Sequence, residues 1–414
     1  MSVGAGRYPF SAGGAVPPLI VGGDGVYLRT ADGRRVLDGC AGAIVGNIGW
    51  GRPEPAAAAA TAMAGGGYVV PIWATPHRLH LIEQLTSGWL PAGFERVFLT
   101  SGGSESTDSA LRLARSYQLA KGRPQRWRVV GRHPSFHGMT LATVAVASHA
   151  SRRAGFEPML ADFPKVAWDD PASVIALFEG PDAHTIAGFL AEPITGAAGA
   201  CLTASNDYWR TVTELCRRHD VLLMADEVMC GYGRTGLTWG HQHFPFEPDV
   251  IVGGKGLGGG YVPIGAVSAH RRVTDVLAAN GLMFFTFGGN DAACAAASTV
   301  LDILHTEGLV ERAAVIGAVL GDALRSAVAS HPLVRDVRGR GMFYGVELGC
   351  AAADVMAAAL ARDLFVYPAG TGAEPVPQAV MVAPPFVVTE PDIDLIVTRL
   401  VDALDAVARL SSAT

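Results

Sequence analysis

The sequence predicts an α/β protein with a mostly parallel sheet, helices on both faces of it, and a second, α+β lobe. Apolar runs of strand length alternate with helical segments up to about residue 291, the order typical of a parallel sheet, and the alternation then stops. Two of the apolar runs end in a charged residue, Asp226 and Lys255. Because open α/β sheets build their sites at the carboxyl ends of strands, both residues are candidates for a functional site.

The segment before the sheet is expected to contain a β-hairpin. Residues 25–29 and 34–38 flank Asp32-Gly33, a pair that favours a tight turn. Residues 41–50 are apolar and punctuated by glycine, which predicts a buried loop or a pocket lining. Helices are expected at residues 55–64 and 80–90, with Trp73 in the loop between them.

The strands and helices of the predicted sheet follow in order. Strands are expected at residues 96–100, 129–130, 186–191, 221–226 and 250–252, and helices at residues 106–121, 172–178 and 206–219. In the first of these helices, Ala110, Leu111, Ala114 and Tyr117 recur at helical spacing. After residue 292 we expect a long helix, then the run VRGRGMFYGV at residues 337–346, and a closing helix after Pro391, which together indicate the second lobe.

Composition and charge indicate a protein with a small-molecule partner. The chain carries 32 basic and 38 acidic residues, a net charge of -6, without the basic block of a nucleic-acid-binding protein. Its six cysteines form no Cys-x-x-Cys pair, which argues against a zinc site or a disulfide framework and suggests buried thiols. The absence of a signal peptide and of any 18-residue apolar run predicts a cytoplasmic protein with no membrane partner.

Residues 100–105 form a candidate phosphate site. They lie between a predicted strand and a predicted helix and include Gly102, Gly103 and Ser104. Backbone N–H groups, a hydroxyl and the positive end of a helix dipole converge in such a turn, which binds phosphate. A serine followed by Glu105 also fits an ordinary helix N-cap, so the sequence leaves both interpretations open.

Lys255 is the candidate nucleophile. It follows a predicted buried strand and is flanked by glycines, and a confined amine with a lowered pKa suits imine chemistry. The alternative is a nucleotide loop, since residues 254–259 match G-x-G-x-x-G; however, Gly260, Tyr261 and Pro263 follow where that fingerprint needs a helix. A P-loop does not fit, because Asp249 stands at its first glycine position and Gly256 at its Ser or Thr position.

The pair Asp226-Glu227 suggests metal ligation or acid–base chemistry, but no His or Cys cluster supports a metal. We interpret Glu227 as a solvated or helix-capping acid and Asp226 as the partner of a cationic ring nitrogen, as in pyridoxal phosphate chemistry. Phe136 could stack on such a ring, and Gly138 would allow close approach of the backbone, although Phe136 alone also fits a core residue.

Together these segments resemble the class III aminotransferases of the fold-type-I group of pyridoxal-phosphate enzymes. The similarity covers nearly the whole chain, at residues 101–115, 135–138, 192–193, 226–236, 248–265, 286–290 and 384–385. It implies an aspartate-aminotransferase-like fold whose large domain, residues 56–291, has a mostly parallel seven-stranded sheet between helices. A small α+β domain, residues 292–414, would be joined by the N-terminal segment, residues 1–55.

The resemblance also implies the cofactor pyridoxal 5'-phosphate and a role for each matching residue. Lys255 would form the Schiff-base link and then move the proton between substrate carbon and cofactor. Asp226 would hold the pyridinium nitrogen, between Val228 on one ring face and Phe136 on the other. The remaining matches are the phosphate-binding Gly102, Gly103 and Ser104, then His137 near Asp226, and Glu192 on the substrate side of the pocket.

The segment around Thr286 implies a homodimer with shared active sites. Thr286, with Phe285 beside it, matches the segment that in the family reaches the phosphate bound by the partner subunit.

One departure from the family bears on the substrate. Many relatives have an arginine three residues before the Pro-Pro pair to bind the substrate carboxylate, whereas this chain has Met381. The loop positions that face substrate in relatives carry Ile44 and Trp73 in this chain, and both add apolar surface. The pattern favours an amine- or ω-aminotransferase and leaves open how the keto-acid acceptor is bound.

Three hypotheses follow. The first is a transaminase that moves an amino group from an amine or ω-amino compound to a keto acid such as pyruvate or 2-oxoglutarate. The second keeps the cofactor but changes the reaction to that of an aminomutase, racemase, lyase or decarboxylase, since a fold does not fix the chemistry. The third is a nucleotide-binding protein that uses the glycine run.

Overall fold

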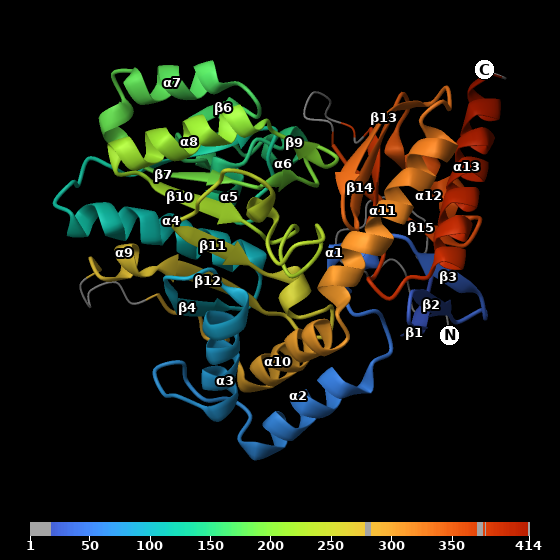
Figure 1. Cartoon of the computed structure of the whole chain (residues 1–414), viewed down its shortest axis with the longest axis horizontal. Helices are drawn as coiled ribbons and strands as arrows, with labels where there is room; N and C mark the ends of the chain where they lie inside the picture. Colours follow the sequence, from blue (N-terminus) through green and yellow to red (C-terminus); the bar gives the residue numbers. More distant parts are fainter. Residues whose placement is uncertain (1–17, 278–282, 371–375, 377, 413–414) are drawn as a thin grey trace.

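Seven strands form the central sheet of the structure, a computed structural model that describes residues 18–277, 283–370, 376 and 378–412 (Figure 1). Their order is β4-β12-β11-β10-β7-β5-β6. The bounds are β4 Phe94–Thr100, β5 Arg128–His133, β6 Lys165–Ala167, β7 Ile186–Ala191, β10 Leu222–Asp226, β11 Val250–Gly253 and β12 Gly265–His270. Only β12 runs antiparallel to its neighbours β11 and β4, so the predicted, mostly parallel sheet is confirmed.

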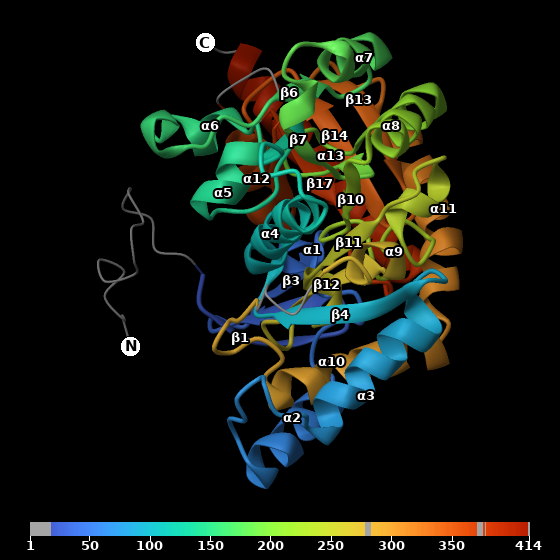
Figure 2. The same ribbon diagram turned by 90° about the vertical axis from the view of Figure 1, so that its left-hand side faces the viewer.

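Helices cover both faces of this sheet, as Figure 2 shows for α4 and α5 on one side and α8 on the other. On one face α4 (Gly103–Ala120), α5 (Leu141–Val146) and α9 (Arg271–Thr274) pack on apolar side chains of β7, β10, β11 and β12. On the other face α7 (Pro171–Glu179) and α8 (Asn206–His219) pack on β5, β6, β7 and β10. Smaller elements of this lobe are α6 (Ala150–Arg153), β8 (Ile194–Thr195) and β9 (Leu202–Thr203).

A smaller lobe is built on an antiparallel sheet of order β13-β14-β17-β16. Its strands are β13 Val334–Arg340, β14 Phe343–Leu348, β16 Tyr367–Ala369 and β17 Ala379–Val382, and its helices α11 Leu309–Val328, α12 Ala352–Leu360 and α13 Glu390–Ser412. The predicted hairpin is present as β2 (Tyr27–Thr30) and β3 (Arg35–Asp38). Together with β1 (Ile20–Asp24) it joins β15 (Leu364–Phe365) in a second sheet. The N-terminal strands thus pair with a C-terminal strand. The domain bounds predicted from the sequence, 1–55, 56–291 and 292–414, stay a prediction.

Three helices, α2 (Pro53–Gly65), α3 (Pro76–Gln84) and α10 (Asp291–Thr306), pack together below the large sheet in Figure 1. The helix expected at residues 80–90 begins earlier because Thr75 caps it and Pro76 suits its first turn, and it ends in a π-helical turn, Leu85–Trp89. The single long helix expected after residue 292 is wrong. It is two helices, α10 and α11, separated by Gly308 in a left-handed conformation (φ 60°).

Residues 41–50 are the predicted buried loop, apart from a short turn, α1 (Ala41–Ile44), in which Gly42 has φ 65°. The six cysteines are free, five of them buried and Cys350 half-buried. Within the described residues, no helix is both long and apolar enough to cross a membrane.

Candidate active site

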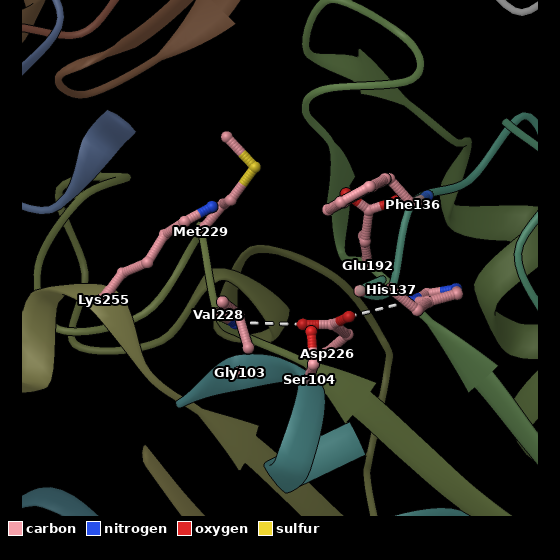
Figure 3. Close-up of a pocket in the computed structure, with 10 residues that line it drawn as sticks. Gly103, Ser104, Phe136, His137, Glu192, Asp226, Val228, Met229 and Lys255 are labelled. Carbon is pink, nitrogen blue, oxygen red and sulfur yellow. Dashed lines mark hydrogen bonds and ion pairs between the residues drawn. The ribbon is translucent and has the colours of Figure 1, made fainter. Parts of the chain in front are cut away.

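Asp226 and Lys255 open onto one cavity at the carboxyl edge of the large sheet (Figure 3). The strands that carry them, β10 and β11, are parallel neighbours, with Asp226 opposite Val252. The cavity has a volume of about 170 Å³. It is lined by Gly103, Ser104, Phe136, His137, Gly138, Glu192, Asp226, Val228, Met229 and Lys255.

Lys255 reaches this cavity from a short 3₁₀ turn, Lys255–Leu257, that follows β11. Its backbone is in the left-handed region (φ 41°), and Figure 3 shows its side chain extending toward Met229. Burial lowers the pKa of the Lys255 ammonium, while the nearby carboxylates of Asp226 and Glu192 act against this shift. The glycine run continues as turns and a loop, so the helix that a dinucleotide fingerprint requires is missing at residues 258–264.

Asp226 is held in place on both carboxylate oxygens. Its Oδ2 lies 2.7 Å from Nδ1 of His137, and its Oδ1 accepts the N–H of Val228 at 3.1 Å. Both the carboxyl group and the imidazole are almost fully buried. The other imidazole nitrogen, Nε2 of His137, is buried without a hydrogen-bond partner among the described residues. The pair therefore presents a fixed negative group to the cavity, with a second polar atom behind it.

Glu192 fixes the turn that carries Phe136. One carboxylate oxygen accepts the N–H of Phe136 at 3.0 Å and the other accepts the N–H of Gly196 at 3.1 Å. Burial, together with the charge of Asp226, raises the pKa of Glu192, whereas His137 and the two backbone donors lower it. Glu192 thus joins the end of β7 to the turn that places Phe136 over the cavity.

Glu227, whose side chain was expected to be solvated or to cap a helix, meets only the second expectation. It is not solvated: its side chain is fully buried. It does cap a helical turn, because its carboxylate accepts the N–H groups of Gly240 and His241 at 2.8 Å each, at the start of the 3₁₀ turn Gly240–His243.

The predicted phosphate turn lies at the N-terminus of α4. This helix begins at Gly103, so its first N–H groups have no partner within the helix and are of the kind that can bind an anion. The turn is tight: a Cβ at Gly103 would lie 2.9 Å from Val228, and a Cβ at Gly138 would lie 2.6 Å from Oγ of Ser104. The serine N-cap is not present: Gly102 occupies the N-cap position and no side chain caps the helix, although Glu105 accepts the N–H of Ser101 at 2.8 Å, a contact similar to the glutamate half of a capping box.

Six residues predicted for the site do not line this cavity: Gly102, Ile44, Trp73, Phe285, Thr286 and Met381. Gly102 directly precedes the first residue of α4. Trp73 is 66% exposed, and Thr286 is exposed on a loop beside Phe285, which packs against Phe98. Ile44 and Met381 are buried together in one apolar cluster.

Met229 lines the cavity and belongs to the same apolar cluster as Ile44 and Met381. It was not among the residues predicted from the sequence. Its position three residues after Asp226 was the available signal, because the chain is still leaving the strand end there. Met229 therefore connects the cavity to the residues expected on its substrate side.

Comparisons with known proteins place nearly the whole chain in one family. The family model for class III aminotransferases matches residues 11–404. Acetylornithine aminotransferase of Mycolicibacterium smegmatis is 36% identical, over 95% of each chain. A transaminase from the marine bacterium Virgibacillus has a TM-score of 0.92 at 28% identity and 97% coverage of each chain. The omega transaminase from Pseudomonas jessenii, solved in complex with PMP, has a TM-score of 0.87 at 28% identity, covering 95% of this chain and 93% of that one.

The cavity fits pyridoxal phosphate, the cofactor of this family, by its set of polar groups. A helix N-terminus suits the phosphate, the buried carboxylate of Asp226 suits a protonated ring nitrogen, and Lys255 supplies an amine. Val228 and Phe136 supply the apolar walls between which a flat ring would lie. The match to the family model and the similarity to aminotransferases favour transamination over both the other pyridoxal-phosphate reactions and the nucleotide-binding alternative. The chain belongs to the class III aminotransferases, and it is a pyridoxal-phosphate-dependent enzyme of that family.

Proposed function

We propose that this aminotransferase takes its amino group from an amine or an ω-amino compound and passes it to a keto acid such as pyruvate or 2-oxoglutarate. The observation that carries the proposal is Met381, which stands where the family resemblance expects a carboxylate-binding arginine. Its side chain is fully buried on β17. A donor that depends on an arginine clamp for an α-carboxylate has no such partner at this position.

The surroundings of Met381 support an apolar substrate side. Met381, Ile44 and Met229 belong to one buried cluster, and Met229 extends that cluster to the cavity. Among the described residues that line the cavity, there is no arginine. An unpaired carboxylate against this wall would lose hydration without gaining a partner, which is costly, whereas an apolar substituent would be stabilised by burial.

The names of the similar proteins suggest which donors to compare. One relative is an acetylornithine aminotransferase, and one structural neighbour is an omega transaminase. Both names fit a donor whose amino group is not bound through an adjacent carboxylate. Acetylornithine and simple primary amines are therefore the donors to test first.

The residues of the cavity have distinct roles in this proposal. When bound, pyridoxal phosphate acts as an electron sink for the substrate carbon that bears the amino group. The lowered pKa of Lys255 leaves its Nζ neutral more readily, so that this atom can take a proton from that carbon and return it. Asp226, hydrogen-bonded to His137, would hold the ring nitrogen of the cofactor through its carboxylate.

We also propose a homodimer whose subunits complete each other's sites through Thr286. In the single chain Thr286 is exposed and does not line the cavity of its own subunit. Large apolar side chains around it are exposed as well, among them Phe284 and Phe287. Exposed apolar surface of this kind is typical of an interface.

The donor class is tested by half-reactions without acceptor. The holoenzyme is mixed with 1-phenylethylamine, acetylornithine, alanine or glutamate, and conversion of the bound cofactor is followed by its visible absorption; pyruvate or 2-oxoglutarate is then added to restore it. We expect conversion at lower concentrations of the amine and of acetylornithine than of the two α-amino acids. Conversion by the α-amino acids alone would overturn the proposed donor class and leave the family assignment intact.

A further inference from the structure

Arg78 joins two loops that are far apart in the sequence. It lies in the first turn of α3, is only 7% exposed, and directs its guanidinium at backbone carbonyl oxygens. Nε donates to Gly289 at 2.9 Å, Nη2 donates to Val69 at 3.1 Å, and Nη1 donates to Trp73. The guanidinium of Arg78 thus holds the loop of residues 69–73 against the loop of residues 283–290.

The second loop leaves little room for rearrangement. Gly289 has φ 65°, and a Cβ there would lie 3.0 Å from Nε of Arg78. A Cβ at Gly288 would lie 2.6 Å from the carbonyl oxygen of Leu99. Asp291, at the start of α10, is hydrogen-bonded to Thr75, which caps α3. The loop that carries Thr286 is therefore fixed at its C-terminal end by α3.

Both loops present large apolar side chains on the surface. Tyr68, Ile72 and Trp73 are exposed on the first loop, and Phe284 and Phe287 on the second. Tyr68 and Phe287 touch across the gap, with ring centroids 5.8 Å apart. A buried arginine beneath an exposed apolar patch that spans two loops indicates that the shape of this surface matters for a contact with another chain.

We propose that Arg78 is a positioning residue for the cofactor site of the neighbouring subunit: it holds the Thr286 loop in the shape that completes the partner's phosphate site. The inference rests on the proposed dimer with shared sites. Loss of the guanidinium leaves three carbonyl oxygens without their donor and frees the loop. Cofactor affinity then falls in the site of the partner, while the subunit's own Lys255 and Asp226 stay as they are.

A role within the same subunit is the competing explanation. Gly288 abuts Leu99 near the end of β4, and β4 leads into the turn that contains Gly103 and Ser104. Arg78 could therefore support the phosphate turn of its own chain. The two explanations differ in which of the two sites fails when one subunit carries the change.

The test uses heterodimers purified through two different tags. The Arg78→Ala homodimer is expected to bind pyridoxal phosphate roughly tenfold more weakly, since lost hydrogen bonds to buried carbonyl oxygens cost about that factor. In a heterodimer of an Arg78→Ala subunit with a Lys255→Ala subunit, one site has no lysine. The other site combines Lys255 of the Arg78→Ala subunit with the unaltered Thr286 loop of the Lys255→Ala subunit. Positioning across the interface predicts about half of wild-type activity, because one of the two sites is complete. It also predicts wild-type cofactor affinity at that site. A role within the subunit predicts that the same site binds pyridoxal phosphate as weakly as the Arg78→Ala homodimer does, and that result would overturn the proposal.

Two further heterodimers with the Lys255→Ala subunit keep the outcome interpretable. Thr286→Ala should also recover about half of wild-type activity, since one of two symmetric sites is complete. Failure of this pair contradicts the shared-site dimer itself, whereas its success together with failure of the Arg78→Ala pair contradicts only the role of Arg78. Arg312→Ala is the matched control, because Arg312 also donates to two carbonyl oxygens, those of Phe386 and Val388 in the small lobe. Its homodimer should keep wild-type affinity for pyridoxal phosphate, and its pairing with Lys255→Ala should also give about half of wild-type activity. If Arg78→Ala does not fold, Arg78→Lys serves in the same pairing.

Discussion

At the scale of single residues, the charges around Lys255 determine when its amine is reactive. Burial lowers the pKa of Lys255, whereas the negative charges of Asp226 and Glu192 raise it. The neutral amine is the form that reacts with an aldehyde, so uptake of cofactor should increase as the pH rises through this pKa. Removing one carboxylate should lower the pKa further, because one attraction for the proton is lost.

This leads to a pH prediction for Glu192→Gln. The rate at which cofactor-free enzyme gains visible absorption with pyridoxal phosphate should rise with pH in both proteins. Its midpoint should lie at lower pH in the variant than in the wild type. Glu247→Gln, at an exposed surface position, is the control and should leave the midpoint unchanged. A midpoint at equal or higher pH in Glu192→Gln contradicts the assigned electrostatics.

Met229 should set the size of the donor that the cavity accepts. Its side chain lies between the cavity and the apolar cluster, and a Cβ at Gly196 would lie 2.8 Å from its sulfur. Met229→Ala is expected to lower KM for bulky amines relative to small ones, while Gly196→Ala, which pushes the thioether toward the cavity, should do the reverse. Measuring kcat and KM for a series of primary amines of increasing size tests both variants. If the ratio of KM for bulky amines to KM for small amines changes in the same direction in the two variants, this role of Met229 is refuted.

At the scale of elements, the turn between β5 and α5 depends on Gly138. This residue has φ 135°, and an added Cβ would meet Oγ of Ser104 at 2.6 Å and Oγ1 of Thr143 at 2.8 Å. Gly138→Ala should therefore displace Ser104 and weaken cofactor binding by roughly tenfold or more, as expected for about 1–3 kcal/mol of strain. Gly122→Ala is the control, since Gly122 also has a positive φ but nothing within 4 Å of its Cβ position. Equal cofactor affinity in the two variants would contradict this account of the turn.

The accuracy of the sequence analysis differs between elements for physical reasons. Helix α8 was predicted with its observed bounds, because Ser205 caps its start and Asp220 ends it in a left-handed conformation. Strand β12 was not predicted: its residues, GAVSAH, include small and polar ones, and it runs antiparallel within an otherwise parallel sheet. The division between α10 and α11 was missed because a single residue, Gly308, makes it.

The same reasoning applies to the site. Asp226 and Lys255 could be placed together because neighbouring parallel strands end at the same edge of a sheet. For Met229 the only signal was its position three residues after Asp226, and the direction of its side chain depends on the loop that follows Asp226 rather than on a repeating pattern. Trp73 and Thr286 are exposed in the single chain, and a role for either in a site depends on a second subunit that no local pattern describes.

At the scale of the whole molecule, Arg234 connects the two lobes. This fully buried arginine donates to the carbonyl oxygens of Met342, Ala383 and Pro384 at 2.7–3.0 Å and to Oδ1 of Asn47 at 2.5 Å. Burial lowers its pKa to about 9, against the attraction of Asp38 and Cys40. It thus ties the loop after Asp226 to the N-terminal loop and to the segment that follows Met381.

Replacing Arg234 by Met should therefore destabilise the protein strongly. Four buried acceptors lose their donor, and removal of a buried charged partner of this kind costs about 3–5 kcal/mol. The midpoint of urea unfolding is expected to fall well below that of the wild type. Arg217→Ala removes an exposed ion pair with Glu247 and should shift the midpoint little, because such pairs contribute about 0–1 kcal/mol. Similar midpoints for the two variants would contradict the role of Arg234 as the connection between lobes.

The central claim, that Lys255 carries the cofactor, is tested most directly by borohydride reduction followed by peptide mapping. The chain has three lysines, which makes the result unambiguous: Lys121, Lys165 and Lys255. Lys165 is the informative competitor, since burial lowers its pKa to about 8, but its Nζ donates to the carbonyl oxygens of Ala145 and Phe163. We expect the reduced cofactor on the peptide that contains Lys255, with no trapping and no turnover in Lys255→Ala and both retained in Lys165→Ala. Label on another lysine, or an active Lys255→Ala enzyme, would contradict the assignment.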